Sequence, residues 1–405
     1  MTTYLVDISR MSYNSARQRD LAKVSSMRIT DVKIFTVTDR WLFVRIETDK
    51  GIYGVGESGF WGYPKATEGV LGTIKKYLIG KDPLQIEHHW QYIYRNNHFR
   101  GAALGGALSA VDIALWDIAG KHYEAPVYQL LGGRTRSKVR LYIHVGRGEY
   151  IGDIAEEVAA DAARAVKLGF TAVRFSPFPR GFENMTHSEL ISSTVHLVKA
   201  VREAVGEKVD MCIDVHGRLT PSEAIVLGRE LEKYRLLFYE DPTVQDSAAA
   251  VAQIARGTSI PIATGERLHT IYEFKELLEL RAVSMVRPDL CLAGGLTQCK
   301  KVAALAEAYQ VGVVPHNPLS PISTAACVQL DACIPNFVIQ EYTGEDKPPK
   351  SELVKLALKL EKGYLVVPET PGIGVELNET AFAKYPHKIR ELATTVRQDG
   401  SVVDV

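Results

Sequence analysis

The sequence predicts an α/β fold, in which a modified TIM barrel of the (β/α)7β type follows a smaller α+β domain. Two observations carry this prediction. Acidic residues recur at a constant interval, since Asp214, Glu240 and Glu266 lie 26 residues apart, and each closes a short apolar run typical of a buried strand. One strand, one helix and two loops of such a barrel take roughly 25 residues. Equal spacing therefore predicts that the three carboxylates lie at the same height on successive strands.

Strand-like and helix-like patterns alternate at a nearly constant pitch through the predicted barrel. Apolar runs predict strands at residues 139–144, 172–176, 209–214, 236–240, 261–266, 284–288, 311–316 and 338–341. The segments between them are rich in Ala, Leu and Glu, as at 153–168 and 221–234, which indicates helices. This alternation predicts a parallel barrel with its helices outside.

The smaller domain is predicted over residues 27–137. Alternating patterns indicate strands at 29–37, 41–47 and 52–55, and Asp49-Lys50-Gly51 between the last two is a hairpin signal. Helical periodicity follows and is strongest at 107–121.

Three further boundaries are predicted. Residues 1–26 lack periodicity and are expected to form a flexible extension. The barrel is expected over 138–360, and the segment 361–405 is expected to pack back on the first domain and complete it.

Composition excludes several kinds of partner. Lys plus Arg and Asp plus Glu both total 48, which gives a formal net charge of zero, and no charged tract reaches five residues. The chain therefore offers no basic surface for nucleic acid or an anionic membrane. No apolar run approaches the length of a membrane span, and the first 26 residues lack the apolar core of a signal peptide. We expect a cytoplasmic protein.

The three acidic residues, if they converge, require a cation. Two unit charges about 4 Å apart repel by roughly 4 kcal/mol at an effective dielectric constant of about 20. Mg²⁺ suits such a site, because it takes a few carboxylates, keeps some waters and leaves positions open for substrate oxygens. Each acid alone could equally be a helix N-cap or a solvated loop residue. Their shared place on three strands favours a magnesium site of Asp214, Glu240 and Glu266.

Other polar residues at strand ends could carry the chemistry, since barrel active sites lie there. His216 stands two residues after Asp214, and residues two apart share a face of a strand, which places it beside the metal. Asp289 and His316 close adjacent strands, and an aspartate bonded to one imidazole nitrogen makes the other more basic. A lone strand-end histidine is more often structural, but this partner favours a catalytic His316.

Together these groups suit abstraction of the weakly acidic proton α to a carboxylate. The cation would bind the substrate carboxylate and stabilise the enediolate, while His316 takes the proton. His216 would then be free to act as an acid. Protonation of a β-hydroxyl gives a dehydration, and return of a proton to the α carbon gives an epimerisation.

A series of motifs in this order is similar to that of a known family. The motifs include Phe99-Arg100-Gly101, Asp214-Val215-His216-Gly217-Arg218, Glu240-Asp241-Pro242, Gly265-Glu266-Arg267, Arg287-Pro288-Asp289-Leu290, Pro315-His316-Asn317-Pro318 and Gln340-Glu341. From Met27 onward the chain resembles the enolase superfamily of the mandelate racemase and muconate lactonizing enzyme type, whose members use a Lys or His base with Mg²⁺. Within it, the chain looks most like the sugar-acid dehydratases of the galactonate or gluconate type.

This resemblance implies an activity and a role for each residue. The activity is Mg²⁺-dependent dehydration of an aldonic acid, such as D-galactonate or D-gluconate, to a 2-keto-3-deoxy acid, in a homo-oligomer. The implied metal ligands are Asp214, Glu240 and Glu266, the base is His316 with Asp289, and the acid is His216. The implied substrate-binding residues are Arg174, Glu341, Trp61 and Arg267, with Glu341 hydrogen-bonding the substrate carboxylate. The first domain would be a capping domain whose loop at Gly59-Phe60-Trp61 closes over the substrate.

One departure from the family lies on the second barrel strand. Many relatives have Lys there as a second base, whereas this chain has Arg174-Phe175-Ser176. Arginine stays charged and cannot serve as a base, which disfavours a two-base racemase. Arg174 would instead bind or orient the substrate carboxylate.

Three alternatives stay open. Mannonate dehydratases share the Asp-x-His motif, but resemblance to them implies a Tyr–Arg pair after the second strand, and the loop 177–188 has Arg180 without a Tyr. Another acid-sugar dehydratase, or a hydroxy-acid epimerase or racemase, would use the same groups. A sugar-acid-binding protein would keep the scaffold without catalysis.

Overall fold

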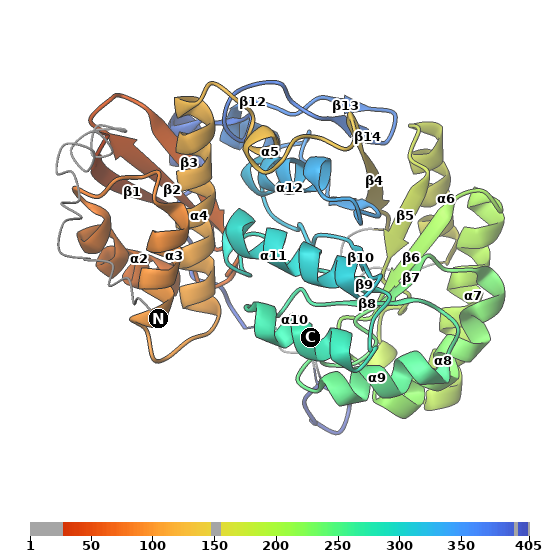
Figure 1. Ribbon diagram of the computed structural model, residues 1–405. Coiled ribbons are helices and arrows are strands. Elements are labelled where there is room, and N and C mark those ends of the chain that lie inside the picture. The colour runs from red at the N-terminus through yellow and green to blue at the C-terminus, as the bar shows by residue number, and fades with distance from the viewer. Residues whose placement is uncertain (1–26, 147–154, 393–395, 404–405) are drawn as a thin grey trace, which may run out of the picture.

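The computed structural model describes residues 27–146, 155–392 and 396–403. A (β/α)7β barrel stands beside a smaller α+β domain (Figure 1). The predicted fold class is therefore confirmed. The predicted flexible extension at 1–26 lies outside the described residues, as do the first two residues of the helix expected at 153–168.

The capping domain is an antiparallel sheet covered by helices. Its strands are β1 (Ile29–Val37), β2 (Trp41–Thr48) and β3 (Tyr53–Ser58), and its helices are α2 (Pro64–Leu78), α3 (Ile86–Arg95) and α4 (Ala102–His122). A Cβ at Gly54 or Gly56 of β3 would overlap backbone carbonyl oxygens of α4, so these glycines allow close packing. By length and composition α4 could span a membrane, but 83% of its most apolar window is buried inside the protein, as in a core helix.

Among the described residues between 138 and 342, eight parallel strands alternate with seven α-helices. The strands are β4 (Lys138–His144), β5 (Ala172–Phe175), β6 (Asp210–Asp214), β7 (Phe238–Glu240), β8 (Ile262–Thr264), β9 (Met285–Val286), β10 (Gly312–Val313) and β11 (Gln340–Tyr342). The helices are α6 (Ala155–Lys167), α7 (His187–Val205), α8 (Pro221–Leu231), α9 (Ala248–Gly257), α10 (Ile271–Glu279), α11 (Gly295–Ala308) and α12 (Pro321–Cys333). The barrel closes where β11 pairs with β4 and Val313 bridges Phe337.

Polar residues set where several barrel helices begin. Thr186 and Thr220 each accept a hydrogen bond from the backbone of a glutamate three residues later, and that glutamate bonds back to the threonine backbone. Such capping boxes satisfy backbone donors that have no partner within the helix. The loops that precede α7 and α8 therefore end at fixed points on the carboxyl side of the barrel.

Two layers of side chains fill the barrel interior. One apolar side chain from each strand forms a buried cluster: Tyr142, Ala172, Cys212, Phe238, Ala263, Met285, Val314 and Ile339. Because side chains alternate along a strand, the residue two positions later faces the same interior nearer the carboxyl end. These second residues are His144, Arg174, Asp214, Glu240, Gly265, Arg287, His316 and Glu341. All but Gly265 are charged or titratable, so a layer of charge lies directly above the apolar cluster.

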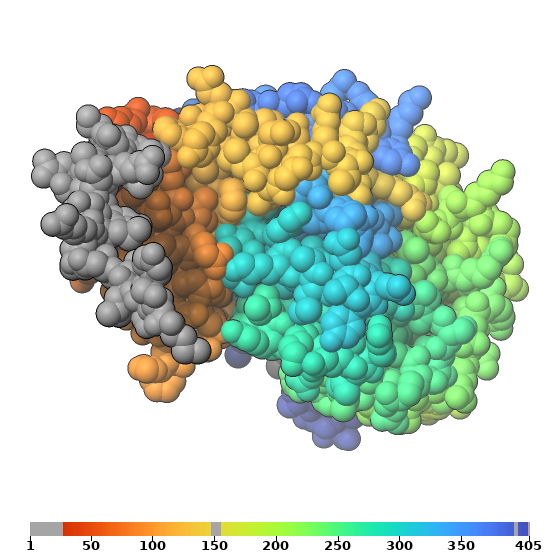
Figure 2. Space-filling view, in the orientation of Figure 1, coloured from red at the N-terminus to blue at the C-terminus, as the bar shows by residue number. Residues whose placement is uncertain are grey.

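The capping domain lies against the barrel (Figures 1 and 2), and buried polar groups connect the two. Ser320 Oγ donates to Glu57 Oε2 at 2.6 Å, and the backbone N–H of Ser323 donates to the same oxygen at 3.0 Å. On α4, Asp112 Oδ2 accepts from the backbone N–H of Thr297 in α11 at 3.0 Å. Carboxylates of the cap thus bind the first turns of α12 and α11, where helix N–H groups have no other partner.

The chain after residue 360 contacts both parts of the molecule. The short helix η5 (Glu379–Lys384) packs on the capping sheet, with the Phe382 ring centre 5.4 Å from Phe35 and 5.5 Å from Phe43. The hairpin of β13 (Leu360–Glu361) and β14 (Tyr364–Val366) does not follow the expected packing on the cap. It pairs instead with the first half of β4, whose hydrogen-bonding edge is free there because β11 pairs only with Leu141–Ile143.

We expect Gly265→Ala to destabilise the protein by about 2 kcal/mol more than Gly206→Ala, within the range typical of overpacking. Both glycines have positive φ, at +134° and +76°, so both substitutions strain the backbone. A Cβ at Gly265 would also lie 2.6 Å from the Phe274 ring, whereas one at Gly206 would meet nothing within 4 Å. Urea unfolding of the two variants measures the difference, and an equal loss would contradict this assignment of crowding.

Candidate active site

The carboxyl ends of the barrel strands open into a cavity of about 480 Å³ that is walled by both domains. Its barrel residues include Arg174, His216, Glu266, Arg267, Asp289, His316 and Glu341; its cap residues include Gly59, Phe60, Trp61 and Tyr63; and the C-terminal segment adds Arg390 and Leu392. Most of the residues selected from the sequence therefore line one cavity. Asp214 and Glu240 lie beneath it and are fully buried.

The expectation of equal height is right for two of the three acids and wrong for the third. Asp214 and Glu240 are direct partners in the register of β6 and β7. Glu240 is paired with Ala263 rather than Glu266, which stands three residues farther along. The strand β8 ends at Thr264, and Gly265 with a φ of +134° turns the chain away from the barrel axis. Glu266 approaches the site from this turn.

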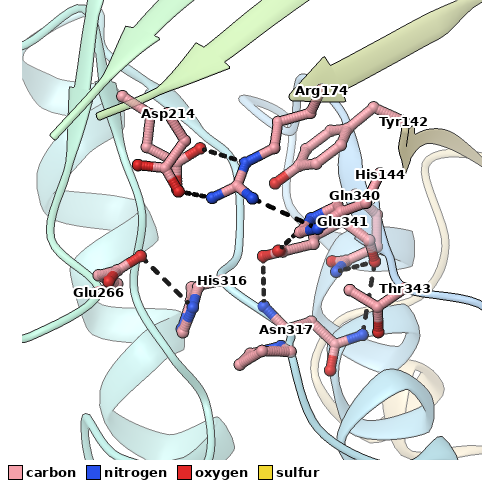
Figure 3. Close-up of polar contacts among 12 residues, drawn as sticks. Tyr142, His144, Arg174, Asp214, Glu266, His316, Asn317, Gln340, Glu341 and Thr343 are labelled. Carbon is pink, nitrogen blue, oxygen red and sulfur yellow. Dashed lines mark hydrogen bonds and ion pairs between the residues drawn. The ribbon is translucent and has the colours of Figure 1, made fainter. Parts of the chain in front are cut away.

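Arg174 lies against Asp214 (Figure 3) and also contacts Glu240. Its guanidinium forms an ion pair with Asp214 Oδ2, its Nε lies 3.3 Å from Glu240 Oε2, and its Nη1 lies 3.3 Å from His144 Nδ1. The resemblance implied that Arg174 binds the substrate carboxylate. Here its charge balances the expected metal ligands, because they are buried and need a nearby positive charge.

Arg287 balances the other side of the same layer. It is fully buried, and its Nη2 lies 2.8 Å from Glu240 Oε1 and 3.0 Å from Glu341 Oε2. Its Nη1 donates to the Tyr142 hydroxyl at 2.9 Å. Burial acts to lower the pKa of Arg287, but Glu240 and the other nearby anionic groups raise it well above its ordinary value. Arg287 is thus a permanent charge within the barrel.

The donor set of the three acids fits Mg²⁺. One oxygen of each, Asp214 Oδ2, Glu240 Oε1 and Glu266 Oε2, is buried without a hydrogen bond and is balanced only through ion pairs. Such oxygens are the ligands that a hard divalent cation prefers. In the described part of the chain, no three Asp, Glu, His or Cys side chains already surround a metal position. Because the guanidinium of Arg174 pairs with Asp214 Oδ2, we expect a cation bound to this oxygen to displace it.

His316 and Asp289 form the predicted pair. His316 Nδ1 lies 2.9 Å from Asp289 Oδ2, and Asp289 Oδ1 accepts from the backbone N–H of Cys291 at 2.7 Å. The other imidazole nitrogen, Nε2, lies 3.4 Å from Glu266 Oε2. Burial acts to lower the pKa of His316, but Glu266 and Asp289 raise it to about 10. Asp289 thus fixes the orientation of the ring and leaves Nε2 directed at the carboxylate side of the cavity.

His216 reaches the site by a different route from the one predicted. The strand β6 ends at Asp214, and His216 has a left-handed backbone with a φ of +53°. Its Nε2 nevertheless lies 3.0 Å from Asp214 Oδ2, and its backbone N–H donates to Asp214 Oδ1 at 2.8 Å. The two side chains meet through a tight turn rather than through strand alternation. His216 and His316 accordingly contact different acids of the set.

Glu341 has a role that the sequence did not indicate. Its Oε1 lies 2.7 Å from His144 Nε2, and its Oε2 accepts from the backbone N–H of Asn317 at 2.7 Å and from Arg287. Burial acts to raise the pKa of Glu341, but His144 and other cations hold it well below its ordinary value. These contacts engage both carboxylate oxygens of Glu341, and its hydrogen bond to a substrate carboxylate stays a prediction. Glu341 also orients His144 and the loop after His316.

The remaining predicted residues lie on the outer wall. Trp61 comes from the loop after β3, and the backbone N–H of Gly59 donates to the Cys291 carbonyl at 2.6 Å, which attaches this loop to the barrel. Arg267 is partly exposed and donates from Nη2 to the backbone carbonyl of His216 at 3.2 Å. Both line the cavity, and Arg267 Nε also lies 3.9 Å from Glu266 Oε1.

Comparison with known proteins identifies the family. The N-terminal domain of the mandelate racemase / muconate lactonizing enzyme family matches residues 23–132, and the enolase C-terminal domain-like family matches residues 157–381. The chain belongs to the enolase superfamily. An enolase from Agrobacterium radiobacter with bound sodium and L-malate has the same fold, with a TM-score of 0.87 at 31% identity over 93% of this chain and 100% of that one.

Similar enzymes of established name include D-galactonate dehydratases. The one from Cronobacter sakazakii is 39% identical over 363 residues, which cover 87% of this chain and 93% of that enzyme. The one from Ralstonia pickettii is 38% identical over 390 residues, covering 93% of this chain and 100% of that enzyme. This superfamily member is therefore an acid-sugar dehydratase, a carbon–oxygen lyase.

The sequence did not predict a role for two residues of this dehydratase. They are His144, which contacts Glu341 and Arg174, and Arg287, which pairs with Glu240 and Glu341. Each stands two positions after an apolar residue of the barrel cluster, Tyr142 and Met285. The same spacing of two residues separates Asp214 and Glu240 from their apolar neighbours Cys212 and Phe238. This spacing could have predicted that His144 and Arg287 lie in the same layer.

The dehydratase without metal should lose stability as the pH rises through the titration of His316. The pKa of His316 in the folded protein, about 10, exceeds its ordinary value of 6.5. Its contribution is therefore fully present below pH 6.5 and is lost as the pH rises through 10. The difference in free energy of unfolding between wild type and His316→Asn should be constant below pH 6.5 and shrink toward pH 10.

Urea titrations with a chelator measure this difference, and substitution of the exposed His187 by Asn is the control. A difference that grows with pH would contradict it.

Arg174→Met should make the protein depend more strongly on a divalent cation. Removing one partner of a buried ion pair costs about 3–5 kcal/mol, because the other charge is left uncompensated. We expect the metal-free variant to unfold at lower temperature than wild type and to gain more from added Mg²⁺. Arg140→Met is the matched control, since Arg140 pairs with Asp210 outside the cavity. Equal Mg²⁺-induced shifts in wild type and Arg174→Met would refute the displacement of Arg174.

Proposed function

We propose that the protein catalyses Mg²⁺-dependent dehydration of an aldonic acid, such as D-galactonate or D-gluconate, to a 2-keto-3-deoxy acid. The observation that carries this proposal is that His216 and His316 line one cavity and contact different acids of the same carboxylate set. A dehydration needs an acid and a base at separate positions on one substrate. The D-galactonate dehydratases among its relatives support the same reaction.

The metal ligands in this proposal are Asp214, Glu240 and Glu266. When bound, Mg²⁺ supplies positive charge that offsets these carboxylates and attracts the carboxylate of the substrate. With the charge of Glu266 offset, the pKa of His316 falls from about 10 toward its ordinary value, and the ring becomes available as a base. The sodium and L-malate bound to the Agrobacterium relative support a cation and a hydroxy acid in this cavity.

The residues of this chain then divide the reaction between them. His316 takes the proton from C2 on Nε2, while Asp289 holds the ring and stabilises its positive charge. His216 gives a proton to the hydroxyl that leaves C3, so that one water is released. The enol that remains gains a proton at C3 and becomes the 2-keto-3-deoxy acid. Arg267 lines the cavity next to His216 and is placed to contact substrate hydroxyls.

Epimerisation is the second candidate, because the same base could remove the C2 proton and another group could return it. Arg174 disfavours this reaction, since it cannot act as the second base and its charge is committed to Asp214 and Glu240. A cytoplasmic location and a homo-oligomer stay predictions, as does the sugar acid as the only partner.

Substitution of the two histidines should separate the two halves of the reaction. Both His316→Asn and His216→Asn are expected to lower the rate of 2-keto acid formation by about 10²–10⁴-fold, the usual contribution of a general acid or base. His216→Asn should still exchange the C2 proton of the substrate with deuterated solvent, whereas His316→Asn should not. NMR of the substrate in D₂O with Mg²⁺ measures exchange, and a 2-keto acid assay measures turnover.

Three controls make this test decisive. A panel of aldonic acids is assayed with wild-type protein, and activity should vanish with a chelator and return with Mg²⁺. No turnover of any member would refute the proposed reaction. Exchange at C2 by wild type without release of water would assign the site to an epimerase.

A further inference from the structure

The C-terminal segment forms part of the outer wall of the cavity. The backbone N–H of Thr38 donates to the Tyr385 carbonyl at 3.1 Å, and His387 Nδ1 lies 2.7 Å from the Thr38 carbonyl. These contacts attach the segment to the turn between β1 and β2. A few residues later, Arg390 and Leu392 line the cavity itself. A part of the chain outside both catalytic strands and cap loops therefore faces the substrate space.

Arg390 is held there by an aromatic contact. Its guanidinium carbon lies 4.5 Å from the ring centre of Trp61, and that of Arg40 lies 5.2 Å from the same ring. Each is a favourable cation–π contact, but the two cations repel one another. Arg40 donates to the Pro318 carbonyl, and neither guanidinium forms an ion pair with a carboxylate among the described residues. An anion beside Arg390 would relieve this repulsion.

Groups of both signs line the barrel side of the cavity, whereas Arg390 lies on its wall beside Trp61 of the capping domain. At the inner end Glu266, Asp289 and Glu341 provide carboxylates, and the proposed cation and His316 handle the reacting carbons. At the outer end the charged group that faces the cavity beside Trp61 is the guanidinium of Arg390. An acid whose first carboxylate lies at the inner end would place its remote end toward this guanidinium.

We propose that Arg390 binds a second carboxylate at the remote end of the substrate, so that the site prefers six-carbon dicarboxylic sugar acids over the matching aldonic acids. This inference rests on the proposed function for the placement of the reacting end. A guanidinium can hold a carboxylate through two parallel hydrogen bonds, whereas it offers a terminal hydroxyl only a weaker contact with an uncharged oxygen. The wall around Trp61 then distinguishes substrates by the charge of their last carbon.

Binding to protein that cannot turn over tests the preference. We would measure the Kd of galactarate and galactonate, and of glucarate and gluconate, by calorimetry with Mg²⁺ on the His316→Asn background. The dicarboxylic acid of each pair should bind at least about tenfold more tightly, which corresponds to 1.4 kcal/mol. Adding Arg390→Gln should bring each ratio close to one and change the Kd of the aldonic acids less than about threefold.

Two further variants separate a local contact from general charge and folding effects. Lys388→Gln removes the same charge from an exposed position on the same segment and should leave the ratios unchanged. Arg390→Lys keeps the charge without the bidentate geometry and should keep part of the preference. Equal Kd values within each pair for the parent protein would overturn the inference. The inference would also be overturned if Arg390→Gln weakened the binding of both acids of a pair equally. An effect of Lys388→Gln on the Kd ratios as large as that of Arg390→Gln would overturn it too.

The same experiment distinguishes this inference from the proposed function. If wild-type protein converts no sugar acid but Arg390 still determines a preference for dicarboxylic acids, the reaction is wrong and the binding assignment holds. If aldonic acids are dehydrated and Arg390→Gln leaves kcat/KM unchanged for both members of each pair, the reaction holds and the role of Arg390 is wrong.

Discussion

The structure depends on charge neutralisation inside a barrel. Above the apolar cluster, residues at the carboxyl ends of β6, β7 and β11 provide buried carboxylates, and burial of an unpaired charge costs several kcal/mol. Arg287 neutralises Glu240 and Glu341 from within the layer, and Arg174 neutralises Asp214 from its edge. The barrel can hold these acids close together only because positive charge is supplied at the same depth. Any reaction in the cavity has to preserve this balance of positive and negative charge.

The two arginines meet this constraint in different ways. Arg287 is fully buried and is bonded to Tyr142 and to two carboxylates. Arg174 is nearly as buried, yet it borders the cavity. If a divalent cation binds Asp214 as proposed, Arg174 would lose this partner, whereas Arg287 would keep its two carboxylates. The two arginines therefore differ in their access to the cavity, although the sequence presents both at equivalent strand positions.

Local periodicity determined how much of the fold and of the candidate site could be predicted from the sequence. The strands, their order and the pairing of Asp214 with Glu240 follow from apolar runs of regular spacing, because a strand that ends in the barrel must place its last side chains at the rim. The position of Glu266 did not follow, since one glycine with positive φ ends β8 early. Arg390 could not be predicted at all. Its segment has no periodic pattern, and its contact with Trp61 depends on how the capping domain sits on the barrel.

The capping domain also affects the base, through Glu57 rather than through the cavity wall. Burial raises the pKa of Glu57 to about 8, and its carboxylate bonds Ser320 and Ser323 at the start of α12, a few residues after His316. Asn317, next to His316, is held in turn by Glu341. The loop that carries the base is therefore fixed from the cap on one side and from the barrel on the other.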